Sequence, residues 1–126
     1  MSADKTPTIK MLESLGADPE DFLNTLSLRA LQTFIAEWAD VAISPTRSIE
    51  YAKRKLVFEE LPELTITNFK DPAEFADVMM LLMDIAHLQG IDIQDAIAKK
   101  AIVNCNRNWK IDPETGCANH VEKNDE

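Results

Sequence analysis

The sequence predicts an all-α protein with a four-helix-bundle-like domain. The 126 residues fit one domain, and an aromatic content of 6% with only three glycines argues against a β-sandwich or barrel. Apolar residues recur at three- and four-residue spacing, which is the period of an amphipathic helix. Because so short a chain buries a modest fraction of its surface, we expect the bundle to be completed by self-association.

The chain opens with a polar lead-in over residues 1–17, with a short helical turn near residues 10–15. A first long helix is expected within residues 20–43. Asp18 can cap it, and Pro19 suits the first helical position because that position needs no backbone donor.

A second helix is expected from near Ser48. The clearest boundary in the sequence then opens a third helix, where Asp71 is a good N-cap and Pro72 suits the first helical position. Glu74 falls three residues after the cap, as in a capping box. We expect this helix to end at about Gln89, before a glycine.

A fourth helix is expected from Asp92 to about Asn108, and the chain beyond it is polar and acidic. The predicted organisation is therefore a lead-in at 1–17, a helical domain at 18–109 and a flexible acidic tail at 110–126. Short connections between the four helices are typical of a bundle.

The formal charge of −9 argues against a nucleic-acid partner, which would require a basic face. The longest apolar run, at residues 78–83, is too short to cross a bilayer, and the N-terminus lacks an apolar signal core. Cys105 and Cys117 give no disulfide framework. We therefore expect a cytoplasmic protein with neither a nucleic-acid nor a membrane partner.

The third predicted helix carries acidic residues on an otherwise apolar surface. Apolar side chains cover almost every direction of this helix, which is typical of a buried one. Nevertheless, Glu74, Asp77 and Asp84 fall within a narrow arc. Burial of ionised carboxylates is costly unless a cation or a basic partner compensates them, so we expect a positive group to face this arc.

Glu60 and Glu63 share a face if the segment before the third helix is helical. Two carboxylate pairs on antiparallel neighbours would present oxygen donors to one point, as hard cations such as Mg²⁺ or Mn²⁺ prefer. Glutamate-rich helices are also common as plain solvated faces. A non-catalytic helical adaptor, whose acidic pairs bind Lys53 and Lys100, is therefore a second hypothesis.

Two other metal sites are conceivable from the spacing of ligand types. Asp84 and His87 form a DxxH pattern like that of ferritin-like metal proteins, but such sites require an ExxH from each of two helices. Cys105, Cys117 and His120 would offer zinc three ligands, partly from the tail. Both arrangements are disfavoured.

Lys100, Asn104 and Arg107 are spaced to line one face of the fourth helix. A lysine supplies a point charge and an arginine a planar fork, and both suit phosphate oxygens. Lys53 lies two turns before the acidic segment on the same face and can reach a phosphate or a glutamate. Trp38 of the first helix is a candidate for holding a base, although its spacing equally suits the core.

The string EELPE at 59–63, followed by EFAD at 74–77, resembles the EExxE…ExxD signature of the MazG-like, all-α nucleoside triphosphate pyrophosphohydrolases. The segment 74–109 resembles the phage dATP/dGTP diphosphohydrolase (MazZ-like) branch in its EFADV opening, GIDI turn and K-x-x-x-N-x-x-R-x-W ending. The EW at 37–38 matches the first helix of that branch. The resemblance spans roughly residues 28–109.

The resemblance implies roles for individual residues. It implies four carboxylate metal ligands, namely Glu60, Glu63, Glu74 and Asp77. Glu59, which together with Glu60 would be catalytic, would accept a proton from the attacking water or hold an additional ion. Pro62 departs from the family's pattern and is expected to end or kink the helix, because it lacks a backbone donor.

The resemblance also implies the reaction and its partners. These are hydrolysis of a purine nucleoside triphosphate to the monophosphate and pyrophosphate, with two or more Mg²⁺ or Mn²⁺ ions. We expect dGTP in first place, with dATP or GTP as alternatives, in phage nucleotide-pool remodelling for 2-aminoadenine DNA. Lys53, Lys100, Asn104, Arg107 and Trp38 would bind the substrate. A homodimer or homotetramer is expected, in the host cytoplasm if the protein is phage-encoded.

Overall fold

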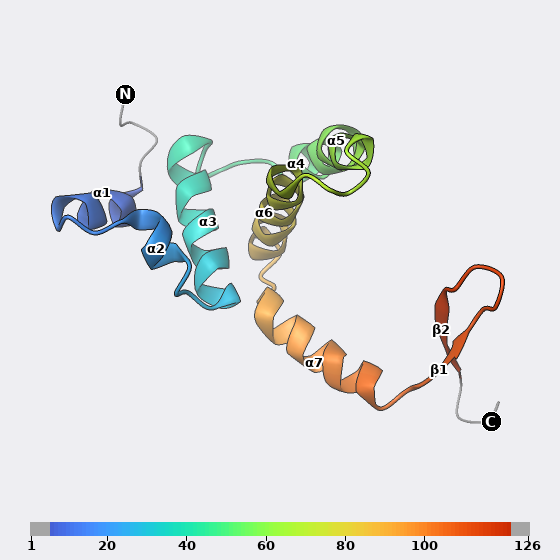
Figure 1. The fold of residues 1–126 in the computed structure, drawn as a ribbon. Coiled ribbons are helices and arrows are strands. Elements are labelled where there is room, and N and C mark those ends of the chain that lie inside the picture. The colour runs from blue at the N-terminus through green and yellow to red at the C-terminus, as the bar shows by residue number, and fades with distance from the viewer. Residues whose placement is uncertain (1–5, 122–126) are drawn as a thin grey trace. The chain divides into compact units, whose positions relative to one another are not determined.

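The computed structural model describes residues 6–121, and these are mostly helical (Figure 1). The all-α prediction is confirmed. The helices are α1 (Pro7–Ser14), α2 (Pro19–Leu23), α3 (Leu28–Ala42), α4 (Ile49–Lys55), α5 (Leu61–Ile66), α6 (Pro72–Leu88) and α7 (Ile93–Cys105), and a π-helical turn, η1 (Leu56–Glu60), joins α4 to α5. Two strands follow, β1 (Asn108–Ile111) and β2 (Ala118–Val121).

The chain divides into two compact units between Ile93 and Gln94. The first unit contains α1 to α6, and the second contains nearly all of α7 together with the two strands. This division falls inside the predicted 18–109 domain. No helix among the described residues is both long enough and apolar enough to span a membrane.

Short polar side chains start the helices of the first unit. Asp18, Ser48 and Asp71, at the three predicted starts, cap α2, α4 and α6, and each accepts a hydrogen bond from a backbone N–H of the first turn. We expected one long helix within 20–43, whereas α2 is short and Ser27 caps a separate helix, α3. The Ser27 hydroxyl accepts from a backbone N–H of its own helix, so it opens α3 instead of continuing α2.

The core of the first unit lies where α3 packs against α6. Ala36 and Ala39 of α3 and Val78 and Met83 of α6 are buried, and small side chains on α3 suit the close packing of the two helices. Gln32 is buried among these apolar groups, but its amide is fully used. Its Nε2 donates to the carbonyl oxygens of residues 83 and 91 at 3.1 and 2.9 Å, and its Oε1 accepts from the amide of residue 93 at 3.0 Å. The third predicted helix, α6, was expected to be buried on nearly all sides. It is buried over part of its surface, at Val78, Met83, Asp84 and Ala86.

The helix that carries the acidic segment does not end at Pro62. The amide of Leu61 donates to the carbonyl of Leu56, five residues back, so the backbone forms a π-turn before continuing as α5. Pro62 lies in the first turn of α5, directly after the π-turn, so its missing donor falls where the hydrogen-bond pattern changes from π to α. The expected end of the helix was wrong, and the departure from regular α-helix is the π-turn instead. This helical stretch from α4 to α5 packs against α6.

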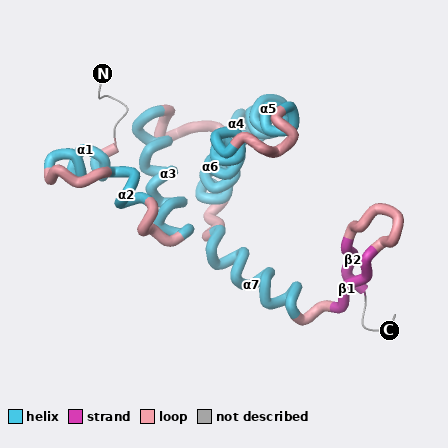
Figure 2. Tube along the Cα trace, in the orientation of Figure 1, coloured by secondary structure: helices cyan, strands magenta, loops and turns pink. Residues whose placement is uncertain are grey.

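The second unit contains α7 and an antiparallel hairpin, whose two strands Figure 2 shows in magenta. Helix α7 ends at Cys105, three residues before its predicted end. Asn108 pairs with Val121 at one end of the ladder, and the hairpin loop turns at Gly116, whose φ of +74° suits glycine. We expected a flexible tail over 110–126, whereas its described residues include the end of β1 and all of β2, which pair through the backbone. Residues 122–126 lie outside the described part.

Candidate metal centre

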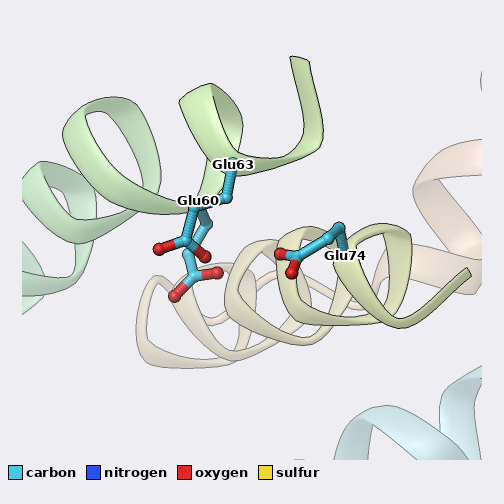
Figure 3. A group of neighbouring side chains, drawn as sticks. All are labelled: Glu60, Glu63 and Glu74. Carbon is cyan, nitrogen blue, oxygen red and sulfur yellow. The ribbon is translucent and has the colours of Figure 1, made fainter. Parts of the chain in front are cut away.

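Three carboxylates from two neighbouring helical segments converge in the first unit. Glu60 is the last residue of η1, Glu63 lies in the first turn of α5, and Glu74 lies in the first turn of α6. Each offers an oxygen, and these three atoms lie within 4.8 Å of one another. Figure 3 shows Glu74 turned across the gap between the helices toward the two other glutamates. We call Glu60, Glu63 and Glu74 the acidic cluster.

The electrostatics of the acidic cluster are unfavourable for the protein alone. Glu60 is only 9% exposed, and the Oε2 atoms of Glu60 and Glu74 are buried with no hydrogen-bond partner. Burial raises the pKa of Glu74, and the charges of Glu63 and Asp77 raise it further. Buried acceptors are nearly always paired, so two unpaired carboxylate oxygens at one point form a site whose chemistry suits a cation. Oxygen-only donors fit a hard divalent ion.

Asp77, the fourth predicted ligand, lies one turn after Glu74 on α6. Its side chain is exposed and is not among the three that converge within 4.8 Å. It nevertheless lines the same cavity as Glu60, and its charge acts on Glu74. The structure therefore brings three of the four predicted ligands together and places the fourth beside them.

Lys55 is the basic residue next to the acidic cluster. Its Nζ lies 3.2 Å from Oε1 of Glu60 and donates to Oε2 of Glu59 at 3.1 Å. The hydrogen bond to Glu59 raises the pKa of Lys55 most, and the hydrogen bond to Glu60 raises it further. The predicted Lys53 instead pairs with Glu50 at 2.9 Å.

Sequence reasoning missed Lys55, although its i, i+4 spacing to Glu59 was visible. Its contact with Glu60 spans five residues, across the π-turn. The predicted catalytic residue Glu59 is exposed and lies outside the acidic cluster, with Lys55 as its partner.

A cavity of about 150 Å³ adjoins the acidic cluster. Its walls are mostly apolar side chains of α3 and α6, including Trp38 and Met80, and its polar lining includes Glu60, Asp77 and Asp84. Trp38 is half-buried, so the residue that we considered for base binding lies in the cavity wall with part of its surface exposed.

Asp84 forms an ion pair with Arg47. Arg47 donates to it twice, from Nε to Oδ2 at 2.7 Å and from Nη2 to Oδ1 at 2.6 Å, and both side chains are 7% exposed. Arg47 also bonds Asp40, and hydrogen bonding to Asp84 is the largest cause of its raised pKa. We predicted a positive group facing the arc of Glu74, Asp77 and Asp84, and at Asp84 this group is Arg47. No such fork reaches Glu74, whose Oε2 stays unpaired.

The two alternative metal sites do not form. Among residues 6–121, the acidic cluster is the only group of three or more carboxylate, imidazole or thiol ligands that come close enough to share an ion. The DxxH pattern of Asp84 and His87 therefore gathers no such group, and Cys105 and Cys117 are exposed thiols.

The predicted phosphate-binding residues belong to the second unit. Lys100 is exposed on α7, and Asn104 lies one turn further along the same helix. Arg107 falls beyond the end of α7, so the predicted helical face holds only for the first two. Nη1 of Arg107 still lies 3.5 Å from Oδ1 of Asn104, which keeps these two side chains together.

Comparison with known proteins adds a family to this geometry. The model of the dATP/dGTP pyrophosphohydrolase family matches residues 31–126. The chain is 44% identical over 87 residues to a dATP/dGTP diphosphohydrolase of Salmonella phage PMBT28, a match that covers 69% of this chain and 29% of that protein. It is 35% identical over 96 residues to a dATP/dGTP diphosphohydrolase of cyanophage S-2L, covering 75% of this chain and 89% of that one. The chain thus spans less than a third of the length of the Salmonella phage relative.

A solved structure is similar in fold as well as sequence. It is the cyanophage S-2L MazG-like pyrophosphohydrolase bound to dGDP and three catalytic Mn²⁺ ions per active site. The TM-score is 0.65 and the sequence identity 34%, over 77% of this chain and 95% of that chain.

Proposed function

The chain belongs to the dATP/dGTP pyrophosphohydrolase family, and on that premise we propose that it hydrolyses a purine nucleoside triphosphate to the monophosphate and pyrophosphate. The acidic cluster, with its two buried and unpartnered oxygens, is the observation that carries the proposal. We favour dGTP as substrate, with dATP and GTP as alternatives. The proposed setting is phage nucleotide-pool remodelling for 2-aminoadenine DNA.

The metal ligands proposed are Glu60, Glu63, Glu74 and Asp77. Two or more Mg²⁺ or Mn²⁺ ions are proposed because the similar cyanophage enzyme holds three Mn²⁺ ions. When bound, divalent ions lower the pKa of water and neutralise charge on phosphate oxygens. The glutamates would supply negative charge to the ions from a partly buried site, where electrostatic interactions are stronger than in water.

Roles for the remaining residues are proposed from their chemistry. Glu59 is exposed beside the acidic cluster and is proposed to accept the proton of the attacking water. Lys100, Asn104 and Arg107 are proposed to bind the triphosphate, since cationic donors and a planar fork suit phosphate oxygens. Lys53 is proposed to bind the substrate with them, which requires it to leave Glu50, its partner in this structure.

Trp38 is proposed to contact the base. Its ring lines the apolar cavity that adjoins the acidic cluster, so one molecule can place its phosphates at the carboxylates and its base against the indole.

The adaptor hypothesis fares less well on the same geometry. It requires the acidic pairs to bind Lys53 and Lys100, yet Lys53 pairs with Glu50. It also leaves the buried oxygens of Glu60 and Glu74 without a partner, which a purely structural helix would have no reason to retain.

The test is a substrate panel. The protein is incubated with each of the common NTPs and dNTPs with Mg²⁺ or Mn²⁺, and the products are separated by ion-exchange chromatography. We expect monophosphate and pyrophosphate, fastest from dGTP. Glu50→Gln is the matched control for Glu60→Gln, since both remove a helical glutamate charge but only Glu60 belongs to the acidic cluster. Diphosphate with phosphate, or inertness with every nucleotide and both metals, would refute the proposal.

A further inference from the structure

We propose that Asp84 selects the base by accepting hydrogen bonds from the edge of guanine, and that Arg47 is the positioning residue that fixes its carboxylate. This inference rests on the proposed function, because it concerns the base of the same nucleotide. It adds a specificity-determining residue to a site whose metal and phosphate ligands have different tasks.

The first argument is position. Asp84 lines the cavity together with Trp38 and with Glu60 of the acidic cluster, although its side chain is only 7% exposed. An acidic side chain more than nine-tenths buried is costly, and here it borders a mostly apolar space next to the catalytic carboxylates. A base that stacks on Trp38 within this cavity would present its edge to the groups that line the same walls.

The second argument is the remaining hydrogen-bonding capacity of Asp84. An ionised carboxylate has about four acceptor positions, and Arg47 occupies two of them through its fork. Arg47 is not in the cavity lining, whereas Asp84 is. Arg47 is itself held, because Nη1 donates to the carbonyl of Ser44 at 3.0 Å and also bonds Asp40. The carboxylate is therefore fixed from one side while it borders the cavity with acceptors to spare.

The third argument is energetic. A buried ion pair is often no more stabilising than apolar residues of similar volume, so stability alone gives a weak reason to retain Arg47 and Asp84 in the core. A rigid, desolvated acceptor is instead what discrimination between bases requires, because a site built to hydrogen-bond a group rejects analogues that lack it.

The chemistry of the purines indicates which base fits. Guanine carries two adjacent donors on one edge, N1–H and the 2-amino group, and a carboxylate offers acceptors only. Adenine has an unprotonated N1 at the corresponding position, whose lone pair would face the negative oxygens. Asp84 should therefore favour guanine over hypoxanthine, which lacks the 2-amino group, and disfavour adenine most.

The experiment compares dGTP, dITP and dATP in the wild type and in Asp84→Asn, by kcat/KM in Mn²⁺. In the wild type we expect dITP to be poorer than dGTP by about tenfold or more, which is the scale of a hydrogen bond to a charged acceptor. In Asp84→Asn we expect the dGTP/dITP ratio to fall to within about twofold, mainly through KM for dGTP. Asp92→Asn is the control, since it removes the carboxylate of another Arg–Asp pair, outside the cavity lining, and should keep the wild-type ratio.

Each outcome decides the matter. A wild type that hydrolyses dGTP and dITP equally well overturns the role of Asp84, as does an Asp84→Asn protein that keeps the wild-type ratio. If Asp84→Asn does not melt cooperatively, the double variant Arg47→Gln/Asp84→Asn leaves no unpaired buried charge and replaces it in the comparison. Inertness of the wild type toward all three nucleotides overturns the role of Asp84, and inertness that extends to every nucleotide of the substrate panel with both metals refutes the proposed function as well.

Discussion

Glu74 sits in the first turn of α6, where a negative charge is ordinarily favoured by the helix dipole. The sequence predicts a capping box there, but the amide of Asp71 lies 3.5 Å from the hydroxyl of Thr67, and Glu74 turns toward the other two glutamates of the acidic cluster. Asp71 alone caps the helix, through the amide of Ala73. Glu74 therefore does not cap the helix, and its carboxylate lies among other negative charges.

Removal of the Glu74 charge should have opposite effects on stability and activity. We expect Glu74→Gln to melt at a higher temperature than the wild type in EDTA, because like-charge repulsion is relieved. We expect kcat/KM to fall more than about a hundredfold, since loss of even a residue that merely supports a metal ligand costs about 10–100-fold. Calorimetry with and without Mn²⁺ checks the pair. A Mn²⁺-induced rise in melting temperature as large as that of the wild type would exclude Glu74 as a ligand.

The raised pKa of Glu74 also predicts the sign of a pH dependence. The folded, metal-free state binds this proton more tightly than the unfolded state, whose ordinary value is 4.5. The contribution to the free energy of unfolding is therefore fully present below pH 4.5 and is lost as pH rises through the raised value.

Melting curves in EDTA across that pH range should show the advantage of Glu74→Gln growing as pH rises. An advantage that stays constant with pH would show that the charge of Glu74 is not responsible for it.

At the scale of elements, Gln32 connects α3 with the chain that leaves α6. We expect Gln32→Leu to lower the free energy of unfolding by about 1–3 kcal/mol, because it removes the hydrogen bonds that join α3 to the carbonyls of residues 83 and 91 and to the amide of residue 93. Urea denaturation measures this. Thr33→Ala, at the exposed neighbouring position, should change it by less than about 0.5 kcal/mol. Equal effects at both positions would contradict the role of Gln32.

The helix boundaries were predictable where the signal is local. Asp71 and Pro72 open α6 as predicted, since capping and a missing donor act within one turn. The π-turn before Pro62 was not predictable, because the sequence indicates only that one donor is absent and not how the backbone redistributes its hydrogen bonds. The strands after residue 107 were missed because their composition is polar, and the pairing that orders them is made across the hairpin.

For the whole molecule, substitutions in the second unit test its proposed role in phosphate binding. We expect Lys100→Ala and Arg107→Ala to raise KM for dGTP by about tenfold, as each removes a charged donor proposed to contact phosphate. Steady-state kinetics measures this. Lys99→Ala is the control, because Lys99 is a neighbouring lysine that pairs with Asp95. An unchanged KM in both variants would place phosphate binding elsewhere.

Self-association remains a prediction of the sequence, and exposed apolar side chains support it. Tyr51, Phe58 and Ile66 of the α4–η1–α5 stretch are 72%, 70% and 83% exposed, and large exposed apolar groups are typical of interfaces. We expect light scattering to give the mass of a dimer or tetramer. Tyr51→Asp with Ile66→Asp should lower that mass, and Lys10→Asp on α1 should not. A monomeric wild type would refute the prediction.

The helical class, three of the helix starts and the two acidic pairs follow from local sequence patterns alone. These depend on spacing within a few residues, and the helical period brings such residues to one face whatever the rest of the chain does. The family could be inferred from the same strings, because they combine ligand types at fixed short spacings.

Which charged side chains lie together depends on how the helices pack. The tertiary structure joined Glu60 and Glu63 with Glu74 and left Asp77 at the edge. It also gave Asp84 the partner Arg47, 37 residues away in the chain. Such contacts depend on how α3, α6 and the η1 stretch pack together, and the packing of a core is a property of all its side chains at once. Local spacing can bring a carboxylate to a face, but only a packed neighbour determines whether a cation, an arginine or water faces it.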